Sequence, residues 1–101
     1  MDEMIKLWRY LIDHNYNVQW KYHKKHIGKD NEYLYINQII VYDEKDERLW
    51  DAICHYGSYG YKQGLIEIYG VICNDVVGYL TADDIINNYI EVGDANGKRV
   101  I

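Results

Sequence analysis

The first stretch of the chain has apolar residues at steps of three and four positions, which is the spacing of one face of a helix. This spacing predicts an amphipathic helix over 2–14, and Asn15 suits its end. Acidic residues open the segment, where the helix dipole favours negative charge. The apolar face predicted for this helix consists of Met4, Ile5, Trp8, Leu11 and Ile12.

The pattern then changes to alternation, which is typical of strands with one buried face. Residues 16–22 alternate between apolar and polar side chains and predict the first strand. Residues 32–42 are apolar on both sides and predict a central strand covered on both faces, and residues 48–55 predict a third strand. The basic segment 23–31 is expected to form a long loop, and the acidic segment 43–47 is expected to form a hairpin turn.

The second half of the chain predicts two short helices. The glycine-rich segment 55–64 breaks the alternation, and a short helix is predicted over 61–69. An extended piece is predicted over 76–80. Thr81 is expected to cap a last helix that runs to about Val92.

The order of these elements predicts one α+β domain over residues 1–101. The domain is expected to contain a helix, a three-stranded antiparallel β-meander and then two short helices (αβββαα). Residues 94–101 are expected to form a flexible tail. Four large side chains are predicted to be largely buried in one core: Trp8, Trp20, Trp50 and Ile85.

Tyrosine dominates the aromatic composition, with twelve copies against no phenylalanine. Tyrosine rings can fill a small core while their hydroxyls reach the surface. They can also form a rigid contact surface, since tyrosine is enriched at interface cores and in paratopes. The sequence leaves both uses open.

Charge is distributed unevenly along the chain. Sixteen acidic and eleven basic residues give a net charge of −5, yet residues 21–29 carry four lysines and no acid. This balance favours a partner with a basic surface and argues against direct nucleic-acid binding, because duplex-binding proteins neutralise phosphates with positive charge. No apolar run reaches the length of a membrane span, and the first three residues do not resemble a signal peptide. We therefore expect no membrane partner and a cytoplasmic location.

No motif for catalysis, cofactor binding or metal binding emerges from the sequence. Cys54 and His55 form the most reactive pair, but neighbours on a strand point to opposite faces, so His55 is poorly placed to activate the thiol. The glycines of segment 55–64 lack the spacing of a phosphate loop, and the four histidines lack the spacing of a metal site. We expect a protein that is not an enzyme and that holds no cofactor and no metal.

Two segments carry a resemblance to known sequences. They are the stretch Cys54-His-Tyr-Gly-Ser-Tyr-Gly60 within 52–67 and the stretch Gly78-Tyr-Leu-Thr-Ala82 within 76–86. Both resemble a pattern found in small proteins of phages and prophages of Gram-positive bacteria, which implies an accessory protein of a mobile element. The order of elements is also similar to that of one class of Cas9-inhibiting anti-CRISPR proteins. That similarity implies an inhibitor that binds a host defence protein, such as a CRISPR effector, in the bacterial cytosol.

Such an inhibitor would act by nucleic-acid mimicry, since Cas9 reads its target-adjacent motif with arginines in a basic groove. The candidate partner-binding residues are the hairpin acids Asp43, Glu44, Asp46 and Glu47, the helix-start acids Asp83 and Asp84, and the tyrosines Tyr59 and Tyr61. Two alternatives stay open. One is a nucleic-acid-binding accessory protein that uses the basic segment 21–29, and the other is a small ligand-binding protein centred on segment 55–64. The sequence also allows a homodimer.

Overall fold

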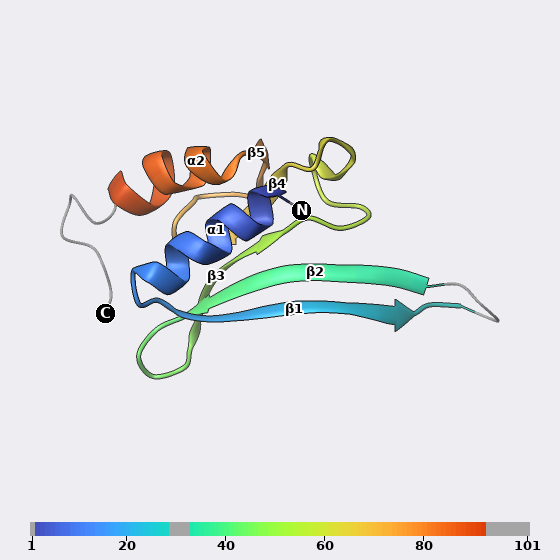
Figure 1. The fold of residues 1–101 in the computed structure, drawn as a ribbon, viewed down its shortest axis with the longest axis horizontal. Helices are drawn as coiled ribbons and strands as arrows, with labels where there is room; N and C mark the ends of the chain where they lie inside the picture. The colour runs from blue at the N-terminus through green and yellow to red at the C-terminus, as the bar shows by residue number, and fades with distance from the viewer. Residues whose placement is uncertain (1, 29–32, 93–101) are drawn as a thin grey trace.

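The computed structural model describes residues 2–28 and 33–92 and shows an α+β fold (Figure 1). All neighbouring strands run antiparallel, in the order β1-β2-β3-β4-β5. The elements are α1 (Asp2–Asp13), β1 (Asn17–His26), β2 (Tyr33–Tyr42), β3 (Arg48–Ile53), the 3-10 turn η1 (Tyr61–Gln63), β4 (Ile66–Gly70), β5 (Val77–Leu80), α2 (Ala82–Ile85) and the π-helical turn η2 (Ile86–Ile90). The sheet therefore has five strands, where the sequence predicted three.

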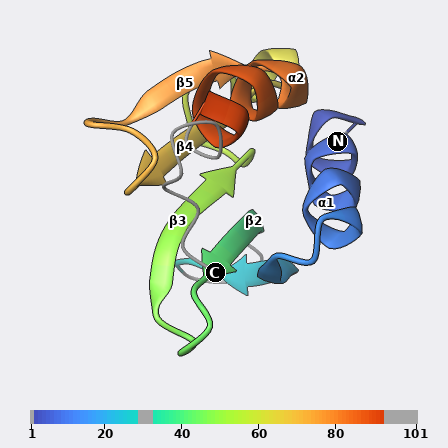
Figure 2. The same cartoon turned by 90° about the vertical axis from the view of Figure 1, so that its left-hand side faces the viewer.

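The sheet curves strongly, and both helices lie on its concave side (Figure 2). The core fills the space between α1, α2 and the middle strands, and each of its large apolar side chains contributes about 1.5–3 kcal/mol by burial. Its fully buried members include Met4, Leu7, Leu11, Ile39, Val41, Ile66, Ile68 and Ile85.

Helix α1 has the predicted bounds but a different buried face. It ends at Asp13, and Asn15 follows with a left-handed φ of 62°, which asparagine tolerates well. Its buried stripe is centred on Leu7, and Ile5 and Ile12 are exposed, contrary to the prediction. In this orientation the Oε1 of Glu3 accepts a 2.8 Å hydrogen bond from the backbone N–H of Ala82 on α2.

The strand before the basic segment continues into it as far as His26, so the predicted loop over 23–31 is wrong over residues 23–26. Strand β1 continues to His26, which pairs with Tyr33 on β2. The resulting two-stranded ribbon extends beyond both helices (Figure 1), and we call residues 21–28 and 33–36 the arm. Polar side chains did not mark a loop here because most of both faces of the arm meet solvent.

The predicted helix over 61–69 is also wrong. Only the short turn η1 is helical, and Gly64 ends it with a φ of 72°. Ile66 and Ile68 then alternate into the core as part of β4, which pairs with β3 and β5. The apolar positions of this segment have the period of a strand, and β-branched isoleucine suits a strand.

The end of the described chain follows its prediction more closely. The predicted extended piece is β5, and Thr81 forms a capping box with Asp84 at the start of α2. The helix continues through η2 and keeps helical geometry to Val92. The tail expected over 94–101 lies outside the described residues. No helix in residues 2–28 and 33–92 is long and apolar enough to cross a membrane.

The four predicted core residues divide into two pairs. Trp50 and Ile85 are buried, with 3% and 0% exposure. Trp8 and Trp20 are only half-buried and contact each other at the rim of the core, with ring centroids 5.5 Å apart. The position of Trp8 follows from the rotation of α1, which places Leu7 at the centre of the interface.

Candidate functional site

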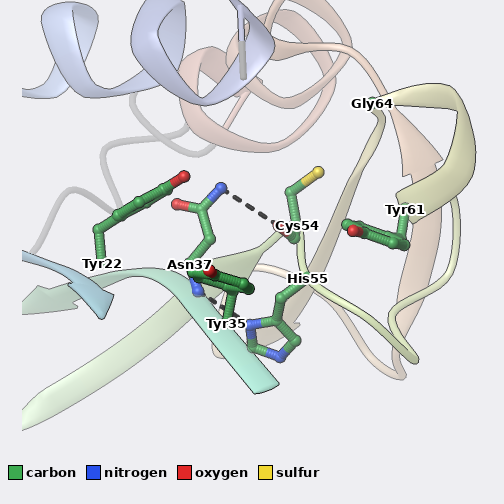
Figure 3. Close-up of a pocket in the computed structure, with 7 residues that line it drawn as sticks. All are labelled: Tyr22, Tyr35, Asn37, Cys54, His55, Tyr61 and Gly64. Atoms are coloured by element: carbon green, nitrogen blue, oxygen red, sulfur yellow. Dashed lines mark hydrogen bonds between the residues drawn. The ribbon is translucent and has the colours of Figure 1, made fainter. Parts of the chain in front are cut away.

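A tyrosine-lined surface runs between the arm and the glycine-rich segment 55–64. One cavity of about 270 Å³ is shown in Figure 3. It is lined by Tyr22, Tyr35, Asn37, Cys54, His55, Tyr61 and Gly64. A second cavity of about 310 Å³ shares Tyr35 and Tyr61 with the first, so the two adjoin each other at these side chains. We call the whole surface the tyrosine groove, with walls formed by Tyr22, Tyr33, Tyr35, Tyr56 and Tyr61.

Strand register places the arm tyrosines on one face. Lys24 pairs with Tyr35 and His26 pairs with Tyr33, and paired residues share a face of the sheet. The Nζ of Lys24 lies 4.3 Å from the centre of the Tyr33 ring, within the range of a cation–π contact. The arm therefore presents aromatic rings and positive charge together.

Glycines hold the opposite wall in place. Gly57 and Gly60 adopt φ values of 94° and 97°, which side chains rarely tolerate. Leu65 donates a backbone hydrogen bond of 2.9 Å to the Gly60 carbonyl, which closes the segment on itself. This backbone presents Tyr56 and Tyr61 edge to face, with ring centroids 6.4 Å apart. The glycine pattern is thus accounted for by a rigid platform for two tyrosines.

The two predicted contact tyrosines have different surroundings. Tyr61 lines both cavities of the groove. Tyr59 lies outside the groove and stacks on Tyr79, with ring centroids 6.5 Å apart. Its backbone N–H donates to the Glu67 carboxylate at 2.9 Å. Tyr59 and Tyr79 form a second, separate exposed aromatic pair.

Two of the four predicted hairpin acids stabilise their own turn. Asp43 accepts backbone hydrogen bonds from Lys45 and Glu47 at 2.8 and 2.9 Å. Asp46 accepts a 2.7 Å hydrogen bond from the side chain of Asn17. Glu44 and Glu47 have exposed side chains. The turn lies at the opposite end of the molecule from segment 55–64, so the structure does not bring these acids together with Tyr59 or Tyr61 (Figure 1).

The acids at the start of α2 also have different roles. Asp84 accepts the backbone N–H of Thr81 at 3.0 Å within the capping box, and Asp83 is exposed. A capping carboxylate is already engaged in the fold. Asp83 is therefore the freer of the two for contact with a partner.

Cys54 and His55 point in opposite directions at the groove, as the strand geometry predicted (Figure 3). Burial raises the pKa of the Cys54 thiol, and burial lowers the pKa of His55 against an opposing effect of the Glu67 carboxylate. A protonated thiol and a neutral imidazole do not form the ion pair of a nucleophilic cysteine. Within residues 2–28 and 33–92, no group of three His, Cys, Asp or Glu side chains is arranged to hold a metal.

Among residues 2–28 and 33–92, no carboxylate lines either cavity of the groove. Lys24 borders it on the arm, and Lys62 lines an adjoining cavity with Tyr56 and Tyr61. Sequence reasoning identified only Tyr61 among the five groove tyrosines. Tyr22 could have been found from the sequence, because Tyr22, Lys24 and His26 continue the alternation of the preceding strand.

Comparison with known proteins adds no relative. The resemblance to phage proteins therefore stands on its residues alone, and the element order compared with that of anti-CRISPR proteins had three strands where the structure has five. No protein-family model, curated protein or solved structure matches the chain, so its function is inferred from the geometry and charge of the tyrosine groove.

Proposed function

We propose that the protein is a non-enzymatic binding protein for single-stranded nucleic acid, and that the strand lies along the tyrosine groove. The observation that carries this proposal is a pair of adjoining cavities walled by five tyrosines, with no carboxylate among the described residues that line them and a lysine on each side. Proteins that bind single strands combine stacking on aromatic rings with a positively charged path for the backbone.

Exposure of the rings supports stacking. Tyr22, Tyr35 and Tyr56 are 56%, 57% and 72% exposed, although tyrosine buries well. Each base stacked on an aromatic ring contributes about 1–3 kcal/mol. The faces of bases are open for stacking in a single strand and covered in a duplex, so the groove favours unpaired bases.

The segment that forms the arm side of the groove is less acidic than the chain as a whole. Residues 17–42 contain four lysines and two acids, Asp30 and Glu32, although the whole chain carries −5. The longest dimension of the molecule is 50 Å, and the acidic turn 43–47 lies toward the end away from the arm (Figure 1). Charges are screened over about 10 Å at 0.1 M salt, so this turn repels a strand at the arm only weakly.

A second candidate function is inhibition of a host defence protein, with the partner bound through protein contacts in the bacterial cytosol. The observation that favours it is the stacked pair Tyr59 and Tyr79, which is 57% and 59% exposed and lies outside the groove. Asp83 follows Tyr79 closely in the chain and is exposed. Exposed tyrosines with adjacent charge are typical of protein interfaces. The resemblance to phage proteins supports an accessory role in either case.

Binding of labelled twelve-nucleotide strands tests the first proposal by fluorescence anisotropy at 50 and 200 mM salt. We expect single strands to bind more tightly than the matching duplex, with an affinity that falls as salt rises. Tyr56→Ala should weaken binding about 5- to 150-fold, the equivalent of one lost stack. Tyr69→Ala is the matched control, because Tyr69 is 59% exposed on β4 and outside the groove.

Charge is tested in the same assay with Lys24→Glu, and Lys45→Glu in the distant turn is its control. Equal losses in the groove variants and their controls, or no binding of any strand, would reject the proposal. Binding of a purified CRISPR effector that is lost in Tyr59→Ala, together with no strand binding, would establish the second candidate instead.

A further inference from the structure

We infer that a bound single strand continues from the tyrosine groove into a third cavity, where Lys62 contacts its phosphate backbone and Tyr79 stacks one of its bases. This inference rests on the proposed function, because it extends the path assigned to the strand. It names the ligand as an oligonucleotide, since a free nucleotide occupies only one part of such a path. It also gives the exposed ring of Tyr79 to the same ligand.

The third cavity connects the groove with Tyr79. Its volume is about 400 Å³, within the range of about 300–1,000 Å³ for ligand sites. It shares Tyr56 and Tyr61 with the groove, so it adjoins the groove at these side chains. A strand in the groove can therefore pass into this cavity along segment 55–64. The lining residues are Tyr56, Gly57, Ser58, Gly60, Tyr61, Lys62, Gln63 and Tyr79.

The charge of this cavity suits a phosphate backbone. Lys62 lines it, and no carboxylate of the described ranges 2–28 and 33–92 does. The Glu67 carboxylate lies outside the lining and accepts a 2.9 Å hydrogen bond from the backbone N–H of Tyr59. A lysine ammonium binds phosphate as a compact point charge and does not require a fixed geometry. An anionic polymer thus meets positive charge between two aromatic sites.

Tyr79 adopts a backbone conformation that aromatic residues rarely take. Its φ is 58°, in the left-handed region. Ile66 pairs with Leu80 and Ile68 pairs with Val77, so three steps along β5 face two steps along β4. Strand β5 therefore contains a β-bulge at Tyr79. Bulges redirect side chains and are frequent beside functional sites.

The fold uses the backbone of Tyr79 more than its ring. The backbone N–H donates to the Tyr59 carbonyl at 3.2 Å, which attaches the bulge to segment 55–64. The ring is 59% exposed and stacks only on the exposed ring of Tyr59 among the aromatic contacts of the described residues. Asparagine or glycine would hold the same backbone with less strain. A strained position that keeps an exposed ring therefore points to a ligand that uses the ring.

The salt dependence of binding tests the contact of Lys62. Lys62→Gln removes the positive charge without adding a negative one. We measure the affinity for a labelled strand of twelve deoxythymidines by fluorescence anisotropy over a series of salt concentrations. The slope of log affinity against log salt should fall in magnitude by about 0.7, the value for one phosphate contact with a single strand. Lys45→Gln in the distant turn is the control and should leave the slope unchanged.

Tyr79→Asn tests the stacked base, because asparagine tolerates the left-handed backbone and removes the ring. We expect about 5- to 150-fold weaker binding of the same strand, the equivalent of one lost stack, with an unchanged salt slope. The midpoint of thermal unfolding should equal or exceed that of the wild-type protein. Tyr69→Asn is the matched control, because Tyr69 is 59% exposed and lines none of the three cavities.

Thymidine monophosphate tests the class of ligand in competition with the labelled strand. It can fill only one part of the path, so we expect it to bind the wild-type protein more than tenfold less tightly than the strand. Equal affinities for the nucleotide and the strand would identify a free-nucleotide site and overturn the inference.

The outcomes separate this inference from the proposed function. Weaker binding by Tyr79→Asn and a smaller slope for Lys62→Gln, together with weaker binding by Tyr35→Ala in the groove, support the inference. Unchanged affinity in Tyr79→Asn, or an unchanged slope in Lys62→Gln, overturns it. If Tyr35→Ala and Lys24→Glu still weaken binding in that case, the proposed function stands.

Three further results are decisive. Losses in Tyr79→Asn and Lys62→Gln with full binding by Tyr35→Ala place the strand outside the groove and reject both the inference and the proposed path. No binding of any strand also rejects both. If Tyr79→Asn unfolds or has a lower unfolding midpoint, its ring serves the fold, and the salt slope of Lys62→Gln decides alone.

Discussion

The same face of β1 and β2 serves two purposes along its length. At the end of the strands covered by α1, Ile39 on this face is a member of the core and Trp20 packs against the core. Along the arm, Tyr22, Tyr33 and Tyr35 occupy the same face and are 44–57% exposed. The strands and their alternation are continuous, and only the covering helix ends. The same alternation of side chains therefore forms part of the core where α1 covers the strands and an exposed surface where α1 no longer covers them.

Tyrosine suits this transition between core and surface. Its ring packs as an apolar core side chain does, and its hydroxyl stays in contact with water where α1 no longer covers the strands. A leucine or an isoleucine in the arm would leave an apolar patch open to aggregation. Lysines at Lys21, Lys24 and Lys25 further protect the exposed edge of β1 from pairing with other chains.

The largest expected difference between the two regions is in stability. Trp50→Ala should lower the free energy of unfolding by about 3–5 kcal/mol, because Trp50 is 3% exposed in the core. Tyr35→Ala should change it by less than about 0.5 kcal/mol, because Tyr35 is an exposed arm residue. Urea titration of both variants measures this, and a large loss for Tyr35→Ala would mean that the arm belongs to the cooperative core.

Glycine substitutions probe the platform opposite the arm. Gly78→Ala should cost about 1–3 kcal/mol, because an added Cβ would lie 2.2 Å from the Cβ of Tyr59. Gly57→Ala is the control for space, since nothing lies within 4 Å of its Cβ and only its φ of 94° opposes a side chain. Thermal unfolding compares them. A smaller loss for Gly78→Ala than for Gly57→Ala would contradict the close packing of β5 on this segment.

Arm tyrosines should separate binding from stability. Tyr35→Ala should weaken the binding of a single strand by about 1–3 kcal/mol while the fold stays intact. Fluorescence anisotropy measures the binding, and circular dichroism confirms the fold. Unchanged affinity with an intact fold would remove this tyrosine from the binding surface and confine the site to the glycine-rich segment.

The smallest expected effect is a dependence of stability on pH that comes from His55. Burial holds its pKa below the ordinary value of 6.5 in the folded protein, so the unfolded chain takes up the proton first as the pH falls. The stability present above about pH 6.5 is therefore partly lost on acidification below it. The free energy of unfolding should fall less between pH 7.5 and 5.5 in His55→Asn than in the wild-type protein. Parallel pH profiles for the wild-type protein and His55→Asn would show that His55 titrates alike in the folded and unfolded states.

Local interactions were readable from the sequence by itself. The bounds of α1, the cap at Thr81 and the turn over 43–47 depend on residues within a few positions of one another. The strand periods over 32–42 and 48–55 were also correct to within a few residues. Capping, turn formation and alternation are short-range effects, so a single sequence contains them.

The groove was decided only by the tertiary structure. Strand β4 was predicted as a helix because apolar spacing in a short segment suits both periods. The end of β1, from residue 23 to His26, was predicted as a loop because solvent on both faces hides the alternation. The register of β1 with β2 brings Tyr22 and Tyr35 opposite Tyr61, which is distant in sequence. The type of a side chain determines which ligands it can bind. Strand pairing between distant residues and the length of α1 determine which tyrosines lie close together and which remain exposed.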